Sequence, residues 1–184
     1  MIVTYQRERL INTIVYFAKN TNYCGKTKLM KLLYFLDFCH FKQTGKTVTG
    51  LEYYAWRMGP VPKALFEEMS NMKPDLSKKV TIVQIENFQK IQAIKPFNDE
   101  CFTRRQLKLL EQLSFVFKDA KAEDMIEVTH LRNEPWHKTL TQKGEFQKID
   151  FILSIDGSKD CLCEDDAHEV MNEITEMHKI FGTS

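Results

Sequence analysis

The sequence predicts an α+β protein that is mainly α-helical: a compact helical domain around a central apolar helix, with a small antiparallel β-sheet. The first supporting observation is a nearly all-apolar stretch, 29–41, which is too hydrophobic for a surface helix. The second is that apolar residues recur at helical spacing in segments before and after it. The third is that aromatic and β-branched residues gather in two short runs, 53–56 and 80–94, as is typical of strands.

The central helix is predicted from the spacing of its leucines. Leu29, Leu33 and Leu36 follow the i, i+4, i+7 pattern of one helix face, and large apolar residues fill the other sides. Thr27 is the predicted N-cap, and Gly45 follows closely enough to mark the end. These signals predict a helix of roughly 14 residues, about 21 Å long, at the centre of the domain.

The other elements are predicted in the same way. Segment 6–19 is an amphipathic helix, and Gly59, Pro60 and Pro62 are expected to end the 53–56 strand before a helix over 63–72. A polar connection over 71–77 then leads to 80–94, a predicted β-hairpin or pair of short strands able to pair with the 53–56 strand.

In the second half of the chain, Thr103 is the predicted N-cap of a helix with apolar residues on one face. A further helix is predicted over 122–131, ending before Pro135. The apolar run 151–155 fits either a strand or a helix. The last segment, 165–181, is predicted to be helical, with Phe181 continuing its apolar face and with acidic residues opposite.

Composition limits the classes of function. The 184 residues are 43% hydrophobic and carry 26 Lys and Arg against 25 Asp and Glu, a formal charge of +1, which removes the general electrostatic argument for nucleic-acid or membrane binding. The five cysteines are irregularly spaced, which predicts no disulfide framework and a reducing compartment. With no apolar run long enough for a membrane span and no signal-peptide pattern, we expect one cytoplasmic domain over residues 1–184.

Two groups of polar residues stand out near the central helix. Asp37 and His40 are three residues apart, so they share a face, and a buried Asp37 needs a partner such as Arg57, His40 or backbone amides. The lysines that cluster between residues 19 and 46, among them Lys26, Lys28 and Lys31, are predicted to form a solvated rim.

No pattern of metal ligands or nucleophiles reaches a recognisable spacing. His130, Glu134 and His137 lack the helical His-Glu-x-x-His spacing, and Cys161 with Cys163 is only a pair of thiols. The sequence therefore predicts no metal, no cofactor and no enzyme. An enzyme using Asp37 and His40 stays open only through groups that the fold would have to bring together.

Three segments together resemble a known family. The run Lys28 to Asp37 with His40, the segment Tyr54 to Val61, and Thr129-His130 with the following Glu-Pro-Trp at 134–136 are similar to the signature of the Panacea domain, the SocA-like antitoxin family also called phage-associated protein. The segments are in the family's order. The resemblance implies a core over about residues 5–140, followed by an acidic helical extension over about 150–184.

The resemblance also implies a function and a set of partners. Members act as antitoxins that neutralise unrelated toxins by direct binding, and the SocA type also delivers its toxin to a bacterial protease. The expected partner is a cognate toxin encoded by the adjacent gene, and a homodimer stays open. The residues expected to bind the partner or to form a structural polar network are Asp37, His40, Tyr53, Tyr54, Trp56, Arg57, Thr129, His130 and Trp136.

An alternative function is regulatory nucleic-acid binding of the winged-helix type. In that interpretation Lys26, Lys28 and Lys31, at the start of the central helix, would contact phosphate. The near-zero net charge argues against it. Strong salt dependence of binding would distinguish it from a toxin interface.

Overall fold

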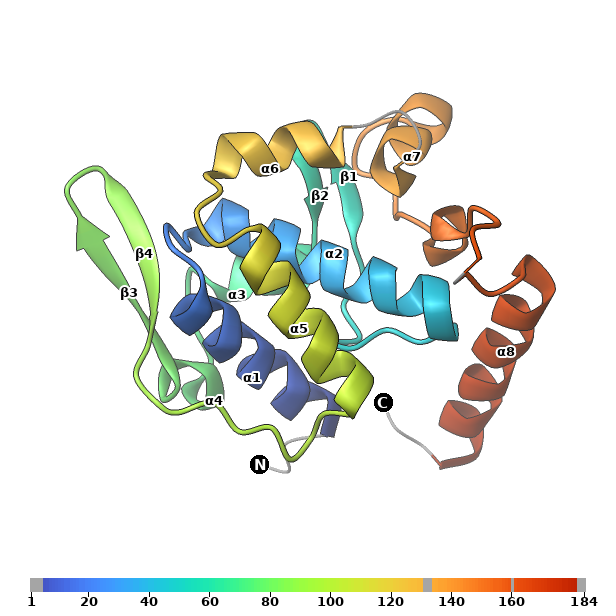
Figure 1. The fold of residues 1–184 in the computed structure, drawn as a ribbon, viewed down its shortest axis with the longest axis horizontal. Helices are drawn as coiled ribbons and strands as arrows, with labels where there is room; N and C mark the ends of the chain where they lie inside the picture. The colour runs from blue at the N-terminus through green and yellow to red at the C-terminus, as the bar shows by residue number, and fades with distance from the viewer. Residues whose placement is uncertain (1–4, 131–133, 160, 182–184) are drawn as a thin grey trace.

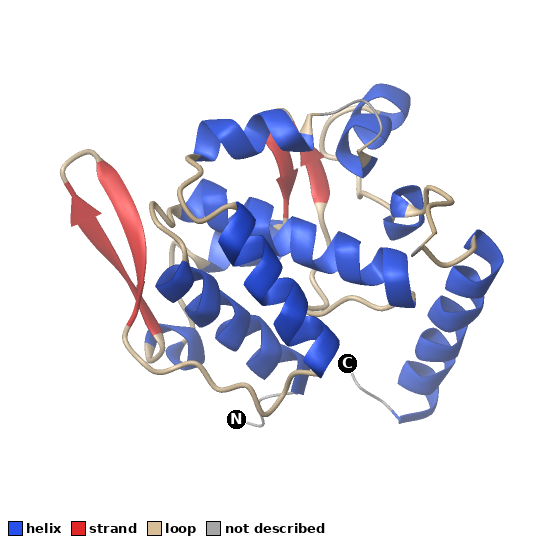
Figure 2. Cartoon of the chain, in the orientation of Figure 1, coloured by secondary structure: helices blue, strands red, loops and turns tan. Residues whose placement is uncertain are grey.

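The computed structural model describes residues 5–130, 134–159 and 161–181 of the chain. Within them the protein is mainly helical with two separate two-stranded antiparallel sheets, which confirms the predicted α+β class (Figures 1 and 2). The elements are α1 (Tyr5–Asn20), α2 (Lys26–Thr44), β1 (Tyr54–Trp56), β2 (Gly59–Val61), α3 (Lys63–Glu68), α4 (Pro74–Ser77), β3 (Val80–Ile85), β4 (Phe88–Ala93), α5 (Arg104–Val116), α6 (Ala122–Thr129), α7 (Pro135–Lys143), the 3-10 helix η1 (Phe151–Ser154) and α8 (Glu164–Phe181).

Helix α2 is the centre of the fold, as predicted. It contacts α1, α5, α6, β2, β4 and η1, and nearly all of its side chains between Lys28 and Phe41 are buried (Figure 1). The predicted start and length are wrong: the N-cap is Gly25, not Thr27, and the helix has 19 residues. Packing on every side stabilises the extra turn without a side-chain cap, because tertiary burial contributes more to helix stability than local signals do.

The 80–94 hairpin is confirmed as β3 and β4, but its predicted pairing with the 53–56 strand is wrong. Strand β1 pairs instead with β2, in the segment where Gly59 and Pro60 were expected to end the strand. The other edge of β1 is occupied by the segment 146–149: the Ala55 amide donates to Gln147 O at 2.8 Å, and the Phe146 amide donates to Ala55 O at 2.8 Å. Both edges of β1 are therefore taken.

Several predicted boundaries differ in the structure. The 63–72 helix ends at Glu68, and a short helix, α4, lies in the predicted polar connection. Helix α6 ends at Thr129, before Pro135 as predicted, and Pro135 begins the next helix, α7, because the first helical position has no need of an amide hydrogen. Leu131, predicted to belong to the helix now seen as α6, lies outside the described residues.

The C-terminal helix α8 is confirmed and lies at the edge of the molecule. Its first half packs beside η1 and the end of α2, where Val170 lies next to Gly45. Just before α8, the Leu162 amide donates to Lys42 O at 2.9 Å. Figure 1 shows the rest of α8 extending away from β1 and β2. No helix among the described residues is long and apolar enough to cross a membrane.

Candidate functional site

Asp37 is fully buried on α2 and organises the loop that follows the helix. Its Oδ1 accepts from the backbone amides of Val48 and Thr49 at 2.7 and 2.8 Å. Its Oδ2 accepts from the Thr49 hydroxyl and from the Tyr53 hydroxyl, the latter at 2.8 Å. Burial raises the pKa of Asp37, and these four hydrogen bonds act in the opposite direction. The predicted backbone-amide partners of this carboxylate are thereby confirmed, and its role is to hold the loop and Tyr53.

His40 belongs to a different group. Its Nδ1 lies 2.6 Å from Lys46 O and 3.2 Å from the Thr44 hydroxyl, at the C-terminal end of α2. Burial lowers its pKa. Among the described residues no hydrogen bond joins Asp37 to His40, so the two groups hold separate parts of the loop.

Two lysines of the predicted solvated rim are buried, which makes that prediction wrong for Lys28 and Lys31. The Lys28 amine donates to three backbone carbonyls, those of Asn22 and Ala120 at 2.7 Å and that of Lys118 at 3.2 Å. It thus ties the start of α2 to the connection between α5 and α6. The sequence alone did not separate these lysines from exposed ones, because a long side chain can extend in either direction.

Lys31 is buried with fewer hydrogen bonds. Its Nζ donates to Met58 O at 2.7 Å, in the turn between β1 and β2. Desolvation lowers the pKa of Lys31 to about 7. Gly59, at φ +117°, lies directly against the amine, so a side chain there would collide with it. The Gly-Pro segment of the turn therefore keeps room for a buried lysine.

Thr129, His130 and Trp136 lie beside this turn. The imidazole of His130 stacks on the Trp136 ring, with 4.0 Å between ring centroids and 7° between planes. Trp136 is buried, and its Nε1 donates to Trp56 O at 2.9 Å. Thr129 is also buried, and its hydroxyl donates to Ile126 O at 2.9 Å within α6. These residues therefore support the β1–β2 hairpin, to which Trp136 is hydrogen-bonded.

Asp37, His40, Thr129 and His130 were all expected to bind the partner or to form a structural polar network, but no direct hydrogen bond among the described residues joins the first two to the last two. Instead, α2 carries separate groups: Asp37 and His40 toward its C-terminal end, and Lys31 near the Thr-His segment. Tyr53 and Trp136 lie in the core, Tyr54 is half-buried, and its hydroxyl donates to Glu52 at 3.2 Å. Of the predicted residues, Trp56 and Arg57 border an open pocket.

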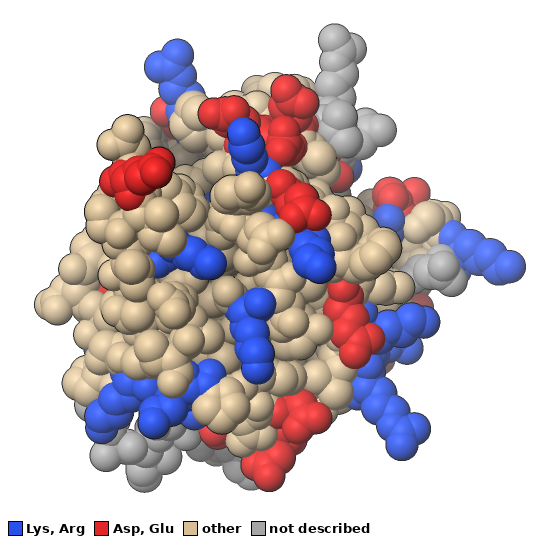
Figure 3. All heavy atoms as spheres, turned by 60° about the vertical axis from the view of Figure 1, so that its left-hand side comes forward, with Lys and Arg blue, Asp and Glu red and all other residues tan. Residues whose placement is uncertain are grey.

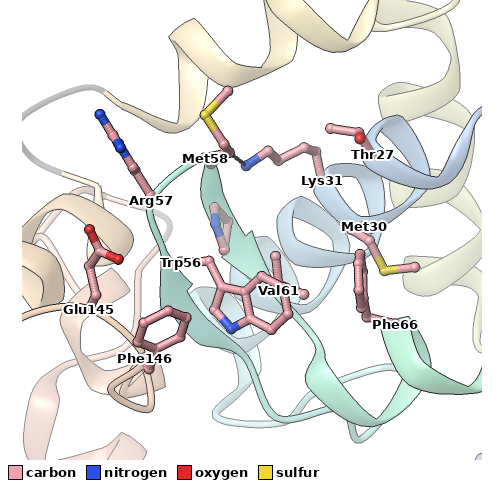
Figure 4. Close-up of a pocket in the computed structure, with 11 residues that line it drawn as sticks. Thr27, Met30, Lys31, Trp56, Arg57, Met58, Val61, Phe66, Glu145 and Phe146 are labelled. Carbon is pink, nitrogen blue, oxygen red and sulfur yellow. Dashed lines mark hydrogen bonds between the residues drawn. The ribbon is translucent and has the colours of Figure 1, made fainter.

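This pocket, here called the hairpin pocket, lies between α2, the β1–β2 hairpin, α3 and the loop before η1 (Figure 4). It measures about 260 Å³, and its walls are almost wholly apolar. Met58 and Phe146 at its mouth are 61% and 63% exposed. The residues that line it are Thr27, Met30, Lys31, Trp56, Arg57, Met58, Pro60, Val61, Phe66, Glu145 and Phe146.

The aromatic side chains of the hairpin pocket come from three separate segments. Trp56 makes edge-to-face contacts with Phe66 at 5.0 Å and with Phe146 at 6.0 Å between ring centroids. Sequence reasoning identified Trp56 but missed Phe66 and Phe146. An exposed aromatic residue far along the chain gives no local signal, since only the pairing of segment 146–149 with β1 brings Phe146 to the pocket.

Lys31 and Arg57 are the basic residues that line the pocket, and Arg57 extends from the hairpin turn (Figure 4). The Lys26 amine, outside the lining, lies 3.6 Å from the centroid of the Phe66 ring. Glu145 is the acid among the lining residues. In Figure 3, which brings the left side of Figure 1 forward, positive and negative groups are interspersed with uncharged surface rather than gathered into one basic patch.

His130, Glu134 and His137, and the Cys161–Cys163 pair, do not form a metal site in the described part of the chain. No three His, Cys, Asp or Glu side chains gather there in a way that could hold a metal ion. The five cysteines are all free thiols, and burial raises the pKa of Cys24 to about 11. The buried polar groups near the pocket thus serve the fold, while the pocket itself offers an apolar surface.

The part of the chain that carries α2, the β1–β2 hairpin, α6 and the start of α7 matches a class of antitoxin-like domains. Residues 29–137, more than half of the chain, match the family described as antitoxin SocA-like, Panacea domain. The chain therefore belongs to the SocA-like, Panacea-domain antitoxin family. No curated protein and no solved structure matches it. Helix α8 lies outside the matched residues.

Proposed function

We propose that this protein is an antitoxin that neutralises a cognate toxin, encoded by the adjacent gene, by direct protein–protein binding in the cytoplasm. The hairpin pocket is the contact surface. Family membership supports a toxin partner, and the observation that carries the choice of surface is an open apolar pocket with aromatic side chains, lined in part by the β1–β2 hairpin within the matched residues. On this proposal the protein acts by occupying the toxin's surface rather than by catalysis.

The physical argument rests on which side chains dominate protein interfaces. Aromatic residues and arginine in a partly enclosed pocket contribute most of the binding energy, while charged residues at the rim add specificity. Trp56 and Arg57 fit this description, since Trp56 is half-buried and Arg57 is exposed. Tyr53 and Trp136 are buried and would support the surface from behind.

The nucleic-acid alternative has lost its main support. Lys28 donates to three backbone carbonyls, Lys31 is buried on Met58 O, and the Lys26 amine lies over the Phe66 ring. All three lysines expected to contact phosphate are thus engaged within the protein.

The test is co-expression with the product of the neighbouring reading frame, followed by growth measurement and co-purification. We expect rescued growth and a stable complex. Trp56→Ala should weaken that complex by roughly 30-fold, which corresponds to about 2 kcal/mol. The matched control is Phe115→Ala on α5, because Phe115 is 84% exposed and does not line the pocket. A neighbour that is harmless and does not bind would contradict the proposal.

The same experiment separates two modes of neutralisation. If the antitoxin masks its toxin, the amount of toxin in the cell stays constant while growth recovers. If it also delivers the toxin to a bacterial protease, the toxin level falls, and deletion of the protease restores it. Equal loss of binding by Trp56→Ala and Phe115→Ala would place the interface elsewhere.

A further inference from the structure

The β3–β4 hairpin leaves one edge of its sheet without a neighbour. Strand β4 contacts α1 and α2, and the Ile91 amide of β4 donates to Cys24 O at 2.8 Å. The hairpin lies at the edge of the molecule, and among the described residues β3 pairs with no strand other than β4 (Figure 1). The outer edge of β3 is therefore the unpaired edge of this sheet.

The register shows which backbone groups lie on that edge. The Ile94 amide donates to Lys79 O at 2.9 Å, directly before the ladder begins at Val80. Hydrogen-bonded and non-hydrogen-bonded pairs alternate along an antiparallel ladder, so every second residue counted from Lys79 bonds to β4. The residues between them, Val80, Ile82 and Gln84, direct their N–H and C=O groups outward. In the described part of the chain, no backbone hydrogen bond reaches Ile82 or Gln84 from outside the hairpin.

The side chains of β3 do not protect this edge. Exposed edge strands usually carry a lysine, a proline or a bulge that prevents pairing with a further strand. Segment 80–85 contains no charged residue and no proline, and every residue in it except Gln84 is β-branched. Its register with β4 is continuous, without a bulge. Such a strand is suited to pair with another strand through its outer edge.

The charges at the two ends of β3 are opposite. Lys78 precedes the strand and Glu86 follows it in the hairpin turn, and both side chains are exposed. Neither belongs to an ion pair among the described residues. An antiparallel neighbour of the same sequence brings the start of one strand beside the end of the other, so opposite charges meet at both ends. A parallel neighbour of the same sequence would bring like charges together.

We propose that two copies of this chain join their β3 edges into one four-stranded antiparallel sheet. A twofold axis at Ile82 pairs Ile82 with Ile82 and Val80 with Gln84 of the second copy, which is the register that engages all three outward-facing residues. In this register Lys78 of each copy lies beside Glu86 of the second copy. The inference goes beyond the proposed function, because β3 contributes no residue to the hairpin pocket.

The test is sedimentation velocity of the full-length protein over a concentration series, with two charge-reversal variants. Glu86→Lys places lysines together at both ends of the shared sheet, and Lys78→Glu places acids together there. Both residues are exposed, so the fold should tolerate either change. The matched control is Glu176→Lys, which reverses an exposed acid on α8, on the opposite side of the molecule from β3 (Figure 1).

We expect the wild type and the control to dimerise, and each variant alone to dimerise about tenfold more weakly. An equimolar mixture of Glu86→Lys and Lys78→Glu should recover association, because a lysine then meets an acid at both ends of the shared sheet. A wild type that stays monomeric overturns the proposal. A mixture that associates no better than either variant alone also overturns it.

Amide hydrogen exchange of the wild type identifies the edge that pairs. The Ile82 and Gln84 amides should exchange more slowly as the protein concentration rises, since only in the dimer do they have acceptors in the protein. In Glu86→Lys at the same concentration these amides should exchange faster than in the wild type. Dimerisation that leaves both amides unprotected overturns the proposal and indicates that the copies meet through another surface.

Discussion

Two of the ionisable side chains that helix α2 buries, Asp37 and Lys31, are held in different ways. Asp37 accepts four hydrogen bonds, two of them from backbone amides, so that both carboxylate oxygens have partners. Lys31 donates to one carbonyl, Met58 O, and desolvation lowers its pKa to about 7. The carboxylate faces the loop that follows α2, whereas the lysine borders the hairpin pocket.

The difference shows what each charge contributes. A buried charge with all its hydrogen bonds made fixes the surrounding backbone, and removing it leaves several donors without an acceptor. A buried amine with one acceptor in an apolar setting loses the solvation of its charged form, which lowers its pKa. For Lys31 the change of protonation therefore falls near neutral pH. Asp37 is thus a structural group, and Lys31 makes the pocket side of α2 sensitive to pH.

The largest expected effect is the loss of the carboxylate. Asp37→Ala leaves the amides of Val48 and Thr49 and two hydroxyl groups without their acceptor, which should lower the free energy of unfolding by about 3–5 kcal/mol. Urea denaturation at pH 7 measures this change. Asp156→Asn, at an exposed ion pair with Lys42, is the control and should change stability by less than about 1 kcal/mol. Equal effects of the two substitutions would contradict the structural role of Asp37.

A smaller effect should come from Lys31, and it depends on pH. The folded-state pKa of about 7 lies below the usual value near 10.4, so between these values the unfolded chain binds more protons than the folded one. Stability linked to Lys31 therefore rises with pH in this window and is lost as pH falls toward 7. From pH 7 to pH 9 the wild type should gain about 2 kcal/mol relative to Lys31→Met.

Urea denaturation of both proteins at pH 7 and pH 9 measures that difference. Using Lys31→Met as the reference cancels the titration of the other groups. Parallel pH dependence of the two proteins would show that Lys31 keeps an ordinary pKa in the folded state and would remove the contrast with Asp37.

The smallest expected effect is that of Gly59→Ala. The alanine backbone would have to adopt φ +117°, and its methyl group would lie against the Lys31 amine. We therefore expect the free energy of unfolding to fall by about 1–2 kcal/mol at pH 9, where that amine is neutral. The displaced amine should also recover water, which reduces the pH dependence described above. Gly144→Ala is the matched control, since Gly144 also has positive φ but nothing lies where its side chain would be. An unchanged pH dependence in Gly59→Ala would argue against this coupling.

Local sequence patterns predicted most of the helices and their order. The apolar spacing of α2 and α8 and the Thr103 cap of α5, which accepts from the Gln106 amide, were readable because they depend on neighbours within one or two turns. The partner of β1 was not predictable in this way. The backbone hydrogen bonds between Ala55 and segment 146–149 join residues about ninety positions apart, and no local pattern marks them.

The candidate site was predictable only in part, because local motifs reveal neighbours in the sequence but not distant packing partners. Trp56 and Arg57 lie in one short motif and were identified from it, while Phe66 and Phe146 reach the pocket only through packing. The burial of Lys28 and Lys31 was missed because their acceptors are backbone carbonyls, which every residue carries and no sequence distinguishes.

The sequence by itself determined the helical class, the central helix, the hairpin over 80–94 and membership in the SocA-like family. These follow from periodicity and motif, which a linear chain displays directly. Only the tertiary structure decided which charged groups of α2 are buried, how β1 is paired, and that Ala167 is the residue of α8 buried against Phe41 and Ile152. Those properties depend on which distant surfaces come into contact, because burial and hydrogen bonding are set by the whole fold.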